Sequence, residues 1–222
     1  MVTLLRYAPR ACLLASAALI LLGLPRPVHA ANGSVVFLTV KYGTQNADGT
    51  GDTLFKQLEN DHGTLKDSRD VVLQGVELDF YSATSRNAGL AVGLELQQYS
   101  KSFRFRATNG TQTDEDLKFA GRAVLFSLKG FLRWGPVLPF FGVGSGNYYV
   151  QYHQATENIS LLDSAPNVFT ARVGARVLVA GHWGVLLETG QTSAPVRIHT
   201  QSGNASLNLG GNFTSAGISY AW

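Results

Sequence analysis

Seven charged residues occupy positions in alternating apolar segments where a β-strand would carry their side chains into an interior. Burying an unpaired charge costs several kcal/mol, so acids and bases placed in this way are expected to pair with one another. We predict a charge network inside the fold, and a narrow pore lined by the same side chains is the alternative. The seven residues are Glu77, Asp79, Glu95, Arg122, Arg172, Arg176 and Glu188.

The order of these charges along the chain indicates which of them pair. Arg172 and Arg176 belong to the segment before a tight turn, and Glu188 belongs to the segment after it. Neighbouring strands would therefore bring both arginines near this glutamate. The three acids nearer the N-terminus also need cations, and we expect Arg122 or Lys41 to supply one.

Three glycines at alternate positions, Gly142, Gly144 and Gly146, have the spacing of part of a dinucleotide-binding loop. That fingerprint requires a strand before the glycines and a helix after them. Here the glycines alternate within one extended segment, and two tyrosines follow. We interpret them as interior strand positions, and the sequence predicts no cofactor and no metal site.

The first thirty residues predict an export signal. Arg6 and Arg10 precede an apolar run of fourteen residues, and the segment ends in Val28-His29-Ala30. These are the positive, apolar and cleavage regions of a secretory signal peptide. A transmembrane helix is the alternative, but it would need about 18 apolar residues. We predict a signal peptide at residues 1–30 and a mature domain at residues 31–222.

Removal of this segment changes the charge of the chain. The whole chain carries 18 Lys and Arg against 15 Asp and Glu, and the leader holds Arg6, Arg10 and Arg26 but no acid. Removing three of the 18 bases leaves a neutral mature domain of 15 bases and 15 acids. A neutral domain gives no support for nucleic acid as a partner. The single cysteine, Cys12, excludes a framework of internal disulfides.

The mature domain shows alternation of period two, which is typical of strands. No helical periodicity appears after residue 30, so we expect no helix there. Long connections follow the odd-numbered strands and short ones follow the even-numbered strands, as in an up-and-down barrel of the outer membrane. Strands are predicted at residues 34–43, 70–82, 90–97, 117–128, 138–151, 168–179, 183–191 and 212–222.

The polar face of these strands is rich in glycine as well as in charge. A soluble surface would have no need for small residues between charges, whereas the lumen of an eight-stranded barrel is only just wide enough for side chains. The apolar face is therefore expected to meet lipid. The predicted fold is all-β, an eight-stranded antiparallel up-and-down transmembrane β-barrel preceded by a cleaved signal peptide.

The end of the chain carries a more specific pattern. Gly217, Tyr220 and the terminal Trp222 stand where the C-terminal β-signal of outer-membrane barrels has its glycine and aromatic residues. Residues 138–149 add a proline, aromatic residues and alternating glycines, as in strands common in small barrels. On these features, residues 31–222 resemble the small outer-membrane barrels of the OmpA/OmpX type, the outer membrane protein beta-barrel domain.

This resemblance implies a location and partners. It implies a monomer in the outer membrane of a Gram-negative bacterium, in contact with outer-membrane lipid and lipopolysaccharide and recognised by the barrel-assembly machinery. Nucleic acid is not expected as a partner. The candidates for interfacial aromatic girdles are Tyr42, Phe80, Tyr149, Tyr220 and Trp222.

Lipid A deacylases are enzymatic barrels of similar size and layout, and they provide a second comparison. Their active-site pattern is His-x-Ser-Asn near the penultimate strand, whereas this chain has Thr189-Gly190-Gln191-Thr192-Ser193 there. Without a nucleophile and a base within hydrogen-bonding distance, catalysis is not expected. The chain is predicted to be no enzyme.

Specific function in such a barrel belongs to the external loops. The predicted connection at residues 44–69 carries five acids against three bases. An acidic loop of this kind would suit an extracellular ligand. The sequence therefore predicts an outer-membrane barrel with a charge-filled lumen and a structural or surface-interaction role. The alternatives are a narrow pore for small solutes or ions and, less favoured, a lipid A-modifying enzyme.

Overall fold

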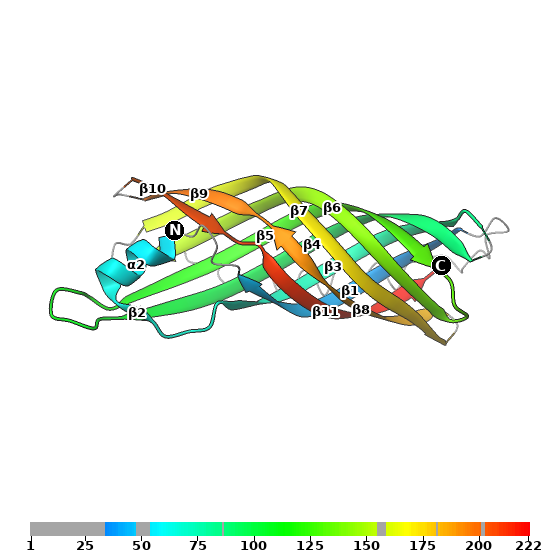
Figure 1. Cartoon of the computed structure of the whole chain (residues 1–222), viewed down its shortest axis with the longest axis horizontal. Coiled ribbons are helices and arrows are strands. Elements are labelled where there is room, and N and C mark those ends of the chain that lie inside the picture. Colours follow the sequence, from blue (N-terminus) through cyan, green and yellow to red (C-terminus); the bar gives the residue numbers. More distant parts are fainter. Residues whose placement is uncertain (1–33, 48–53, 86, 155–158, 181, 201–202) are drawn as a thin grey trace, which may run out of the picture.

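The computed structural model describes residues 34–47, 54–85, 87–154, 159–180, 182–200 and 203–222. The predicted signal peptide at residues 1–30 lies outside the described residues. In the part of the chain that is described, eight antiparallel strands close into a barrel (Figure 1), which confirms the predicted architecture. In order around the wall they are β1 (Ser34–Ala47), β3 (Asp70–Ala83), β4 (Ala88–Arg106), β5 (Glu115–Leu132), β6 (Val137–Gln154), β7 (Ile159–Ala180), β8 (Trp183–Ser193) and β11 (Gly211–Ala221).

The first and last strands close the barrel. The amide of Trp222 donates to the carbonyl of Val36, and the amide of Val36 donates to that of Trp222, both at 3.1 Å. The paired register then continues along β1 and β11 to Ala47 and Gly211. Ser34 pairs with Ser82 beside the β3–β4 turn, so both ends of the described sheet lie at the end of the barrel that carries the short turns, where Figure 1 marks the C-terminus.

Four consecutive strands, β4 to β7, are longer than the sequence analysis predicted. β4 through β7 have 18 to 22 residues, whereas β8 and β11 have 11. On β4 the alternation continues beyond Gln97, but its polarity reverses: Tyr99 and Phe103 point inward and Ser100 and Ser102 point outward. The reversal interrupts the apolar face at Gln97, and for this reason the sequence pattern predicts the end of the strand there.

Short elements close the far end of the barrel. They are the helix α2 (Leu54–His62), the strand β2 (Thr64–Leu65), which pairs with β4, and a hairpin of β9 (Pro195–Thr200) and β10 (Gly203–Asn208). They lie at the left end in Figure 1, opposite the short turns. No helix among the described residues is long and apolar enough to cross a membrane.

The helix α2 corrects the prediction that no helix follows residue 30. Its nine residues are too few to show a sustained helical period, but they bury Leu54, Phe55 and Leu58 against the barrel interior. Gly63, with a φ of 93°, ends the helix, because this left-handed conformation suits glycine. The side-chain amide of Gln112, in the β4–β5 connection, donates to the carbonyl of Asn60 at 2.9 Å.

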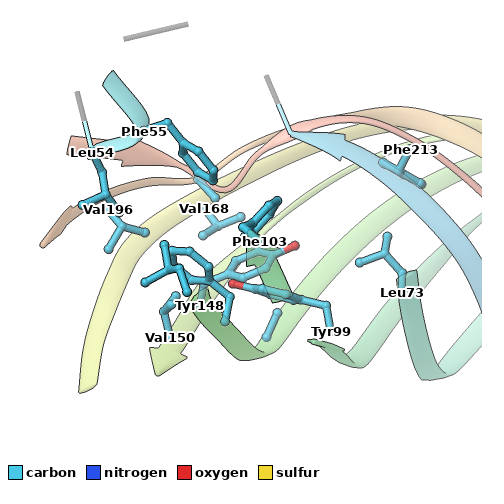
Figure 2. Packing of buried hydrophobic residues seen from close by; sticks show 14 of the residues in the cluster. Leu54, Phe55, Leu73, Tyr99, Phe103, Tyr148, Val150, Val168, Val196 and Phe213 are labelled. Atoms are coloured by element: carbon cyan, nitrogen blue, oxygen red, sulfur yellow. The ribbon is translucent and has the colours of Figure 1, made fainter. Parts of the chain in front are cut away.

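The interior has three layers. An apolar cluster near the short turns contains Phe37, Tyr81 and Phe140. A larger apolar cluster fills the far end, where Phe55 of α2 and Phe103 of β4 meet in an edge-to-face contact with ring centroids 4.9 Å apart. Figure 2 shows side chains of this cluster converging from the helix and several strands. A layer of charged side chains lies between the two clusters.

Candidate functional site

Eight charged side chains form the middle layer, and each is at most 5% exposed. Four are acids and four are bases, so the layer is neutral. They come from β1, β3, β4, β5, β7 and β8. The acids are Glu77, Asp79, Glu95 and Glu188, and the bases are Lys41, Lys129, Arg172 and Arg176.

One half of the charge cluster centres on Lys129. Its ammonium group lies 2.5 Å from Glu77 Oε1 and 2.8 Å from Asp79 Oδ1. Arg176 completes the group, since its Nη2 lies 2.9 Å from Asp79 Oδ2 and its Nε donates to the Ser219 hydroxyl at 3.1 Å. The guanidinium carbon of Arg176 also lies 4.1 Å from the centroid of Phe37, in the apolar layer below.

The other half centres on Lys41 and Arg172. Lys41 Nζ lies 2.5 Å from Glu95 Oε1 and 2.8 Å from Glu188 Oε1, and Arg172 Nη1 lies 2.7 Å from Glu95 Oε2. The hydroxyl of Ser215 donates to Glu188 Oε1 at 2.9 Å. Arg172 Nη1 is also 3.5 Å from Glu77 Oε1, which joins the two halves into one network.

The structure brings together six of the seven charged residues singled out from the sequence. Arg172 approaches Glu188 at 3.6 Å, across β7 and β8 as expected. Arg176 instead reaches across the lumen to Asp79. Lys41, one of the two cations expected to pair with these acids, also belongs to the cluster.

Arg122 is a correction, because it lies on the outer face of β5 and does not contact the cluster. The cation that β5 contributes is Lys129, which the sequence analysis missed. The available signal was the alternation of Ala123, Leu125 and Ser127 with Lys129 on one face, but aliphatic residues stand on both faces of this strand. Its facing was therefore ambiguous until the register was known.

Glycines give the charged side chains their room. A Cβ built on Gly142 would lie 2.8 Å from Lys129 Cγ, and one on Gly217 would lie 2.7 Å from the carbonyl oxygen of Val40 and 3.1 Å from Lys41 Cγ. A Cβ on Gly93 would crowd the Asp79 carboxylate and the Ser127 hydroxyl. Such close approach explains why glycine stands in strands that it otherwise weakens.

Little free volume is found beside the charge cluster. The space beside Lys41, Glu95 and Glu188 is about 10 Å³, which is close to the smallest volume that holds one water molecule. Buried atoms without a protein hydrogen-bond partner include Arg172 Nε and Nη2, Arg176 Nη1 and Glu188 Oε2. Single ordered water molecules are the usual partners of such atoms.

The outer wall around the charge cluster is apolar. Its exposed side chains include Val92 at 57%, Phe126 at 62% and Ile218 at 63%. A soluble protein would bury such side chains, whereas a barrel with an apolar outside and a polar lumen is the form that spans a bilayer. The barrel therefore crosses a lipid bilayer through this belt.

Aromatic residues mark both edges of the belt. Tyr42 and Tyr149 are exposed at the edge nearer the long connections. At the other edge, the ring of Tyr220 lies 5.1 Å from that of Trp183 and 6.4 Å from that of Trp222, centroid to centroid. Within the proposed assembly signal, Gly217 faces the lumen beside Lys41. The role of Gly217, Tyr220 and Trp222 in assembly remains a prediction.

No group of three or more His, Cys, Asp or Glu side chains in the described ranges is arranged to hold a metal ion. Thr189, in the region that corresponds to the deacylase pattern, points outward, and its hydroxyl donates to the carbonyl of Phe213 at 2.8 Å. His182 packs beside Tyr220 at the edge of the belt, with ring centroids 5.7 Å apart.

No protein-family model and no curated protein matches the chain. Among solved structures it is similar to Ail, the attachment invasion locus protein of Yersinia pestis, with 10% identity and a TM-score of 0.46 over 86% of this chain and 99% of Ail. Neisserial surface protein A gives 11% and 0.46 over 85% and 98%. The outer membrane protein OprG from Pseudomonas aeruginosa gives 10% and 0.48 over 86% and 96%. The fold assigned here rests on the strand pairing of this chain itself.

Proposed function

We propose that this chain is an integral outer-membrane β-barrel of a Gram-negative bacterium, with a plugged lumen and a structural or surface-interaction role. The neutral, buried charge cluster carries this proposal, because it fills the lumen between two apolar layers. A conducting path needs polar groups that water or ions can reach along its whole length. Here such a path would have to cross both apolar clusters as well as the charges.

The composition of the cluster supports a plug. Each of its four carboxylates lies within 4.0 Å of at least one cation of the cluster. Breaking one buried pair leaves a charge without compensation, which costs several kcal/mol. The arrangement therefore favours one closed packing of the lumen.

Single-channel recording from the mature chain in planar bilayers tests the plug. The wild type should give no conductance steps. The double variant Arg172→Gln, Arg176→Gln should give them, because it removes two of the four cations that hold the cluster together. Arg133→Gln is the matched control, since it removes a guanidinium from an exposed position in the turn between β5 and β6. Regular ion-selective steps from the wild type would favour the alternative, a narrow pore.

A role as a lipid A-modifying enzyme is the least supported candidate. Among the described residues, His62 Nδ1 lies 3.3 Å from the Thr113 hydroxyl. The same nitrogen lies 3.0 Å from the Thr113 carbonyl oxygen, which can only accept a hydrogen bond, so it carries the proton and does not act as the base that acyl transfer requires. Mass spectrometry of lipid A from cells with and without the protein tests this: we expect identical acyl chains. Loss of an acyl chain only when the protein is present would establish an enzyme.

Partners other than lipid would meet the chain at two places. The barrel-assembly machinery would recognise β11 through its terminal aromatic residues. An extracellular ligand would bind the far end, where α2 and the β9–β10 hairpin lie. Binding assays with loop deletions at that end would identify such a ligand.

A further inference from the structure

A strip of basic side chains lies on the outer wall immediately above the apolar belt. Lys118 and Arg122 both point outward from β5 and are exposed. In the strand register, Lys118 stands opposite His153 of β6, and Arg122 stands opposite Tyr149. On the other side, Lys118 faces Ser102 of β4. The residues opposite the two cations therefore include no acid, and the nearest acid on the same face of β5, Asp116, is paired with Arg106.

Other bases on this part of the wall already have partners. Arg104 Nη2 lies 2.8 Å from Asp67 Oδ1, and Arg106 Nη1 lies 2.9 Å from Asp116 Oδ1. Lys101, at an inward position of β4, donates to the carbonyl of Asp70 at 2.7 Å. Within the described ranges, neither Lys118 nor Arg122 has an ion pair. The unpaired cations are thus those nearest the belt.

The strand register sets the position of Lys118 and Arg122 relative to the apolar belt. On β4 the outward residues are aliphatic up to Leu96, and the next outward residue is Gln98, which pairs with Arg122. On β5 the outward residue below Arg122 is Val124. With a rise of about 3.3 Å per residue, Lys118 stands roughly 13 Å farther along the strand. Arg122 therefore marks the edge of the hydrocarbon layer, and Lys118 lies at headgroup depth.

We propose that Lys118 and Arg122 form a site for the phosphate groups of a phosphorylated lipid of the outer leaflet, on the outer wall formed by β4, β5 and β6. This inference rests on the proposed function, because it requires the belt to sit in an outer membrane with the long connections outside. Short turns face the periplasm in such barrels and longer loops face outward. The two cations then meet lipid phosphates at the depth where those phosphates lie. The exposed hydroxyls of Ser100 and Ser102 add hydrogen-bond donors beside them.

The test compares lipids that differ only in phosphate. The mature chain, folded in neutral detergent, is titrated with diphosphoryl lipid A, with dephosphorylated lipid A and with inorganic phosphate, and bound lipid is measured by native mass spectrometry. Wild type should bind diphosphoryl lipid A, and Lys118→Gln with Arg122→Gln should weaken that binding roughly thirtyfold. Binding of dephosphorylated lipid A should be weak and equal in the two proteins.

The double variant Lys56→Gln, Arg133→Gln is the matched control. It removes the same two charge types from exposed positions on α2 and on the turn at the opposite end, and its binding should equal that of wild type. Equal affinity of wild type and Lys118/Arg122 variant for diphosphoryl lipid A would overturn the proposal. Equally tight binding of inorganic phosphate, or of dephosphorylated lipid A, would also overturn it. Heat-dependent mobility of every variant on SDS gels tests the barrel separately, so loss of the site and failure of the barrel are distinguishable.

Discussion

The membrane-spanning half of the barrel and the half beyond it use the same wall with opposite polarity. On β4, even-numbered residues point outward and odd-numbered residues inward from one end to the other. In the first half the outward residues include Leu94 and the inward ones Glu95. In the second half the outward residues include Arg104 and the inward ones Phe103. Only the chemistry of the two faces changes, at about the level of Gln98.

The difference shows that the surroundings, and not the strand, decide which face is apolar. Lipid around the first half requires an apolar exterior, so the polar residues turn inward and must neutralise one another. Water around the second half restores the ordinary arrangement, with an apolar core and a polar surface. The outer half thus folds like a small soluble barrel with α2 as part of its core. The charge cluster is the consequence of the lipid, because lipid leaves buried polar side chains no other partners.

Breaking the charge cluster should have the largest effect on the free energy of unfolding. Lys129→Met keeps the volume of the side chain but leaves Glu77 and Asp79 without their shared cation. We expect a loss of about 3–5 kcal/mol in the free energy of unfolding. Urea unfolding in lipid vesicles, followed by gel mobility, measures it, with Arg133→Gln as the control. A loss of unfolding free energy no larger than that of the control would contradict a stabilising role of the cluster.

A charge on the outer face should separate the two halves most sharply. Leu94→Arg places a cation against the hydrocarbon and should cost about 2–4 kcal/mol in the free energy of unfolding. Ser100→Arg, three outward positions farther along the same strand, should cost less than about 0.5 kcal/mol because it faces water or headgroups. The same unfolding assay compares them. Equal costs would contradict the proposed position of the membrane.

The anchoring of α2 tests the outer half alone. Gln112→Ala removes the donor to the carbonyls of Asn60 and Glu59, and also the acceptor of Thr108. It should cost about 1–2 kcal/mol of local stability, as for one or two ordinary hydrogen bonds. Amide exchange of α2 should quicken, while that of the strands in the belt stays unchanged. Exchange that quickens equally in both halves would show that they unfold as one unit.

The smallest expected effect is a pH dependence of stability that arises in the outer half. The hydrogen bond from the Arg104 side chain lowers the pKa of Asp67 from the ordinary 3.8 to about 2. A lowered pKa means that the ionised pair stabilises the fold above about pH 4, and that this contribution is lost as the pH falls through 4 toward 2. Because the pair is exposed, salt should weaken the effect.

A comparison of wild type with Asp67→Asn measures this effect. Wild type should lose slightly more stability than the variant between pH 6 and pH 2 at low salt. At high salt the two should converge. A difference of the opposite sign would rule out stabilisation by this pair.

The sequence alone determined the eight strands and most of their facings. Alternation is a local property: two neighbouring side chains on a strand point to opposite faces whatever the rest of the chain does. It therefore placed Arg172, Arg176 and Glu188 correctly toward the lumen. It also predicted the closed barrel, because long and short connections alternate along the chain.

Only the tertiary structure decided which charges meet and where the strands end. Arg176 pairs with Asp79 across the lumen, and that contact depends on the closure of the barrel, which no local pattern records. Lys129, and not Arg122, faces the interior because the register of β5 against its neighbours sets its facing. The outer ends of the strands and the helix α2 could not be predicted from the sequence for a related physical reason. There the apolar residues cross to the other face of the strands, and only a wall with lipid on one part and water on another explains why.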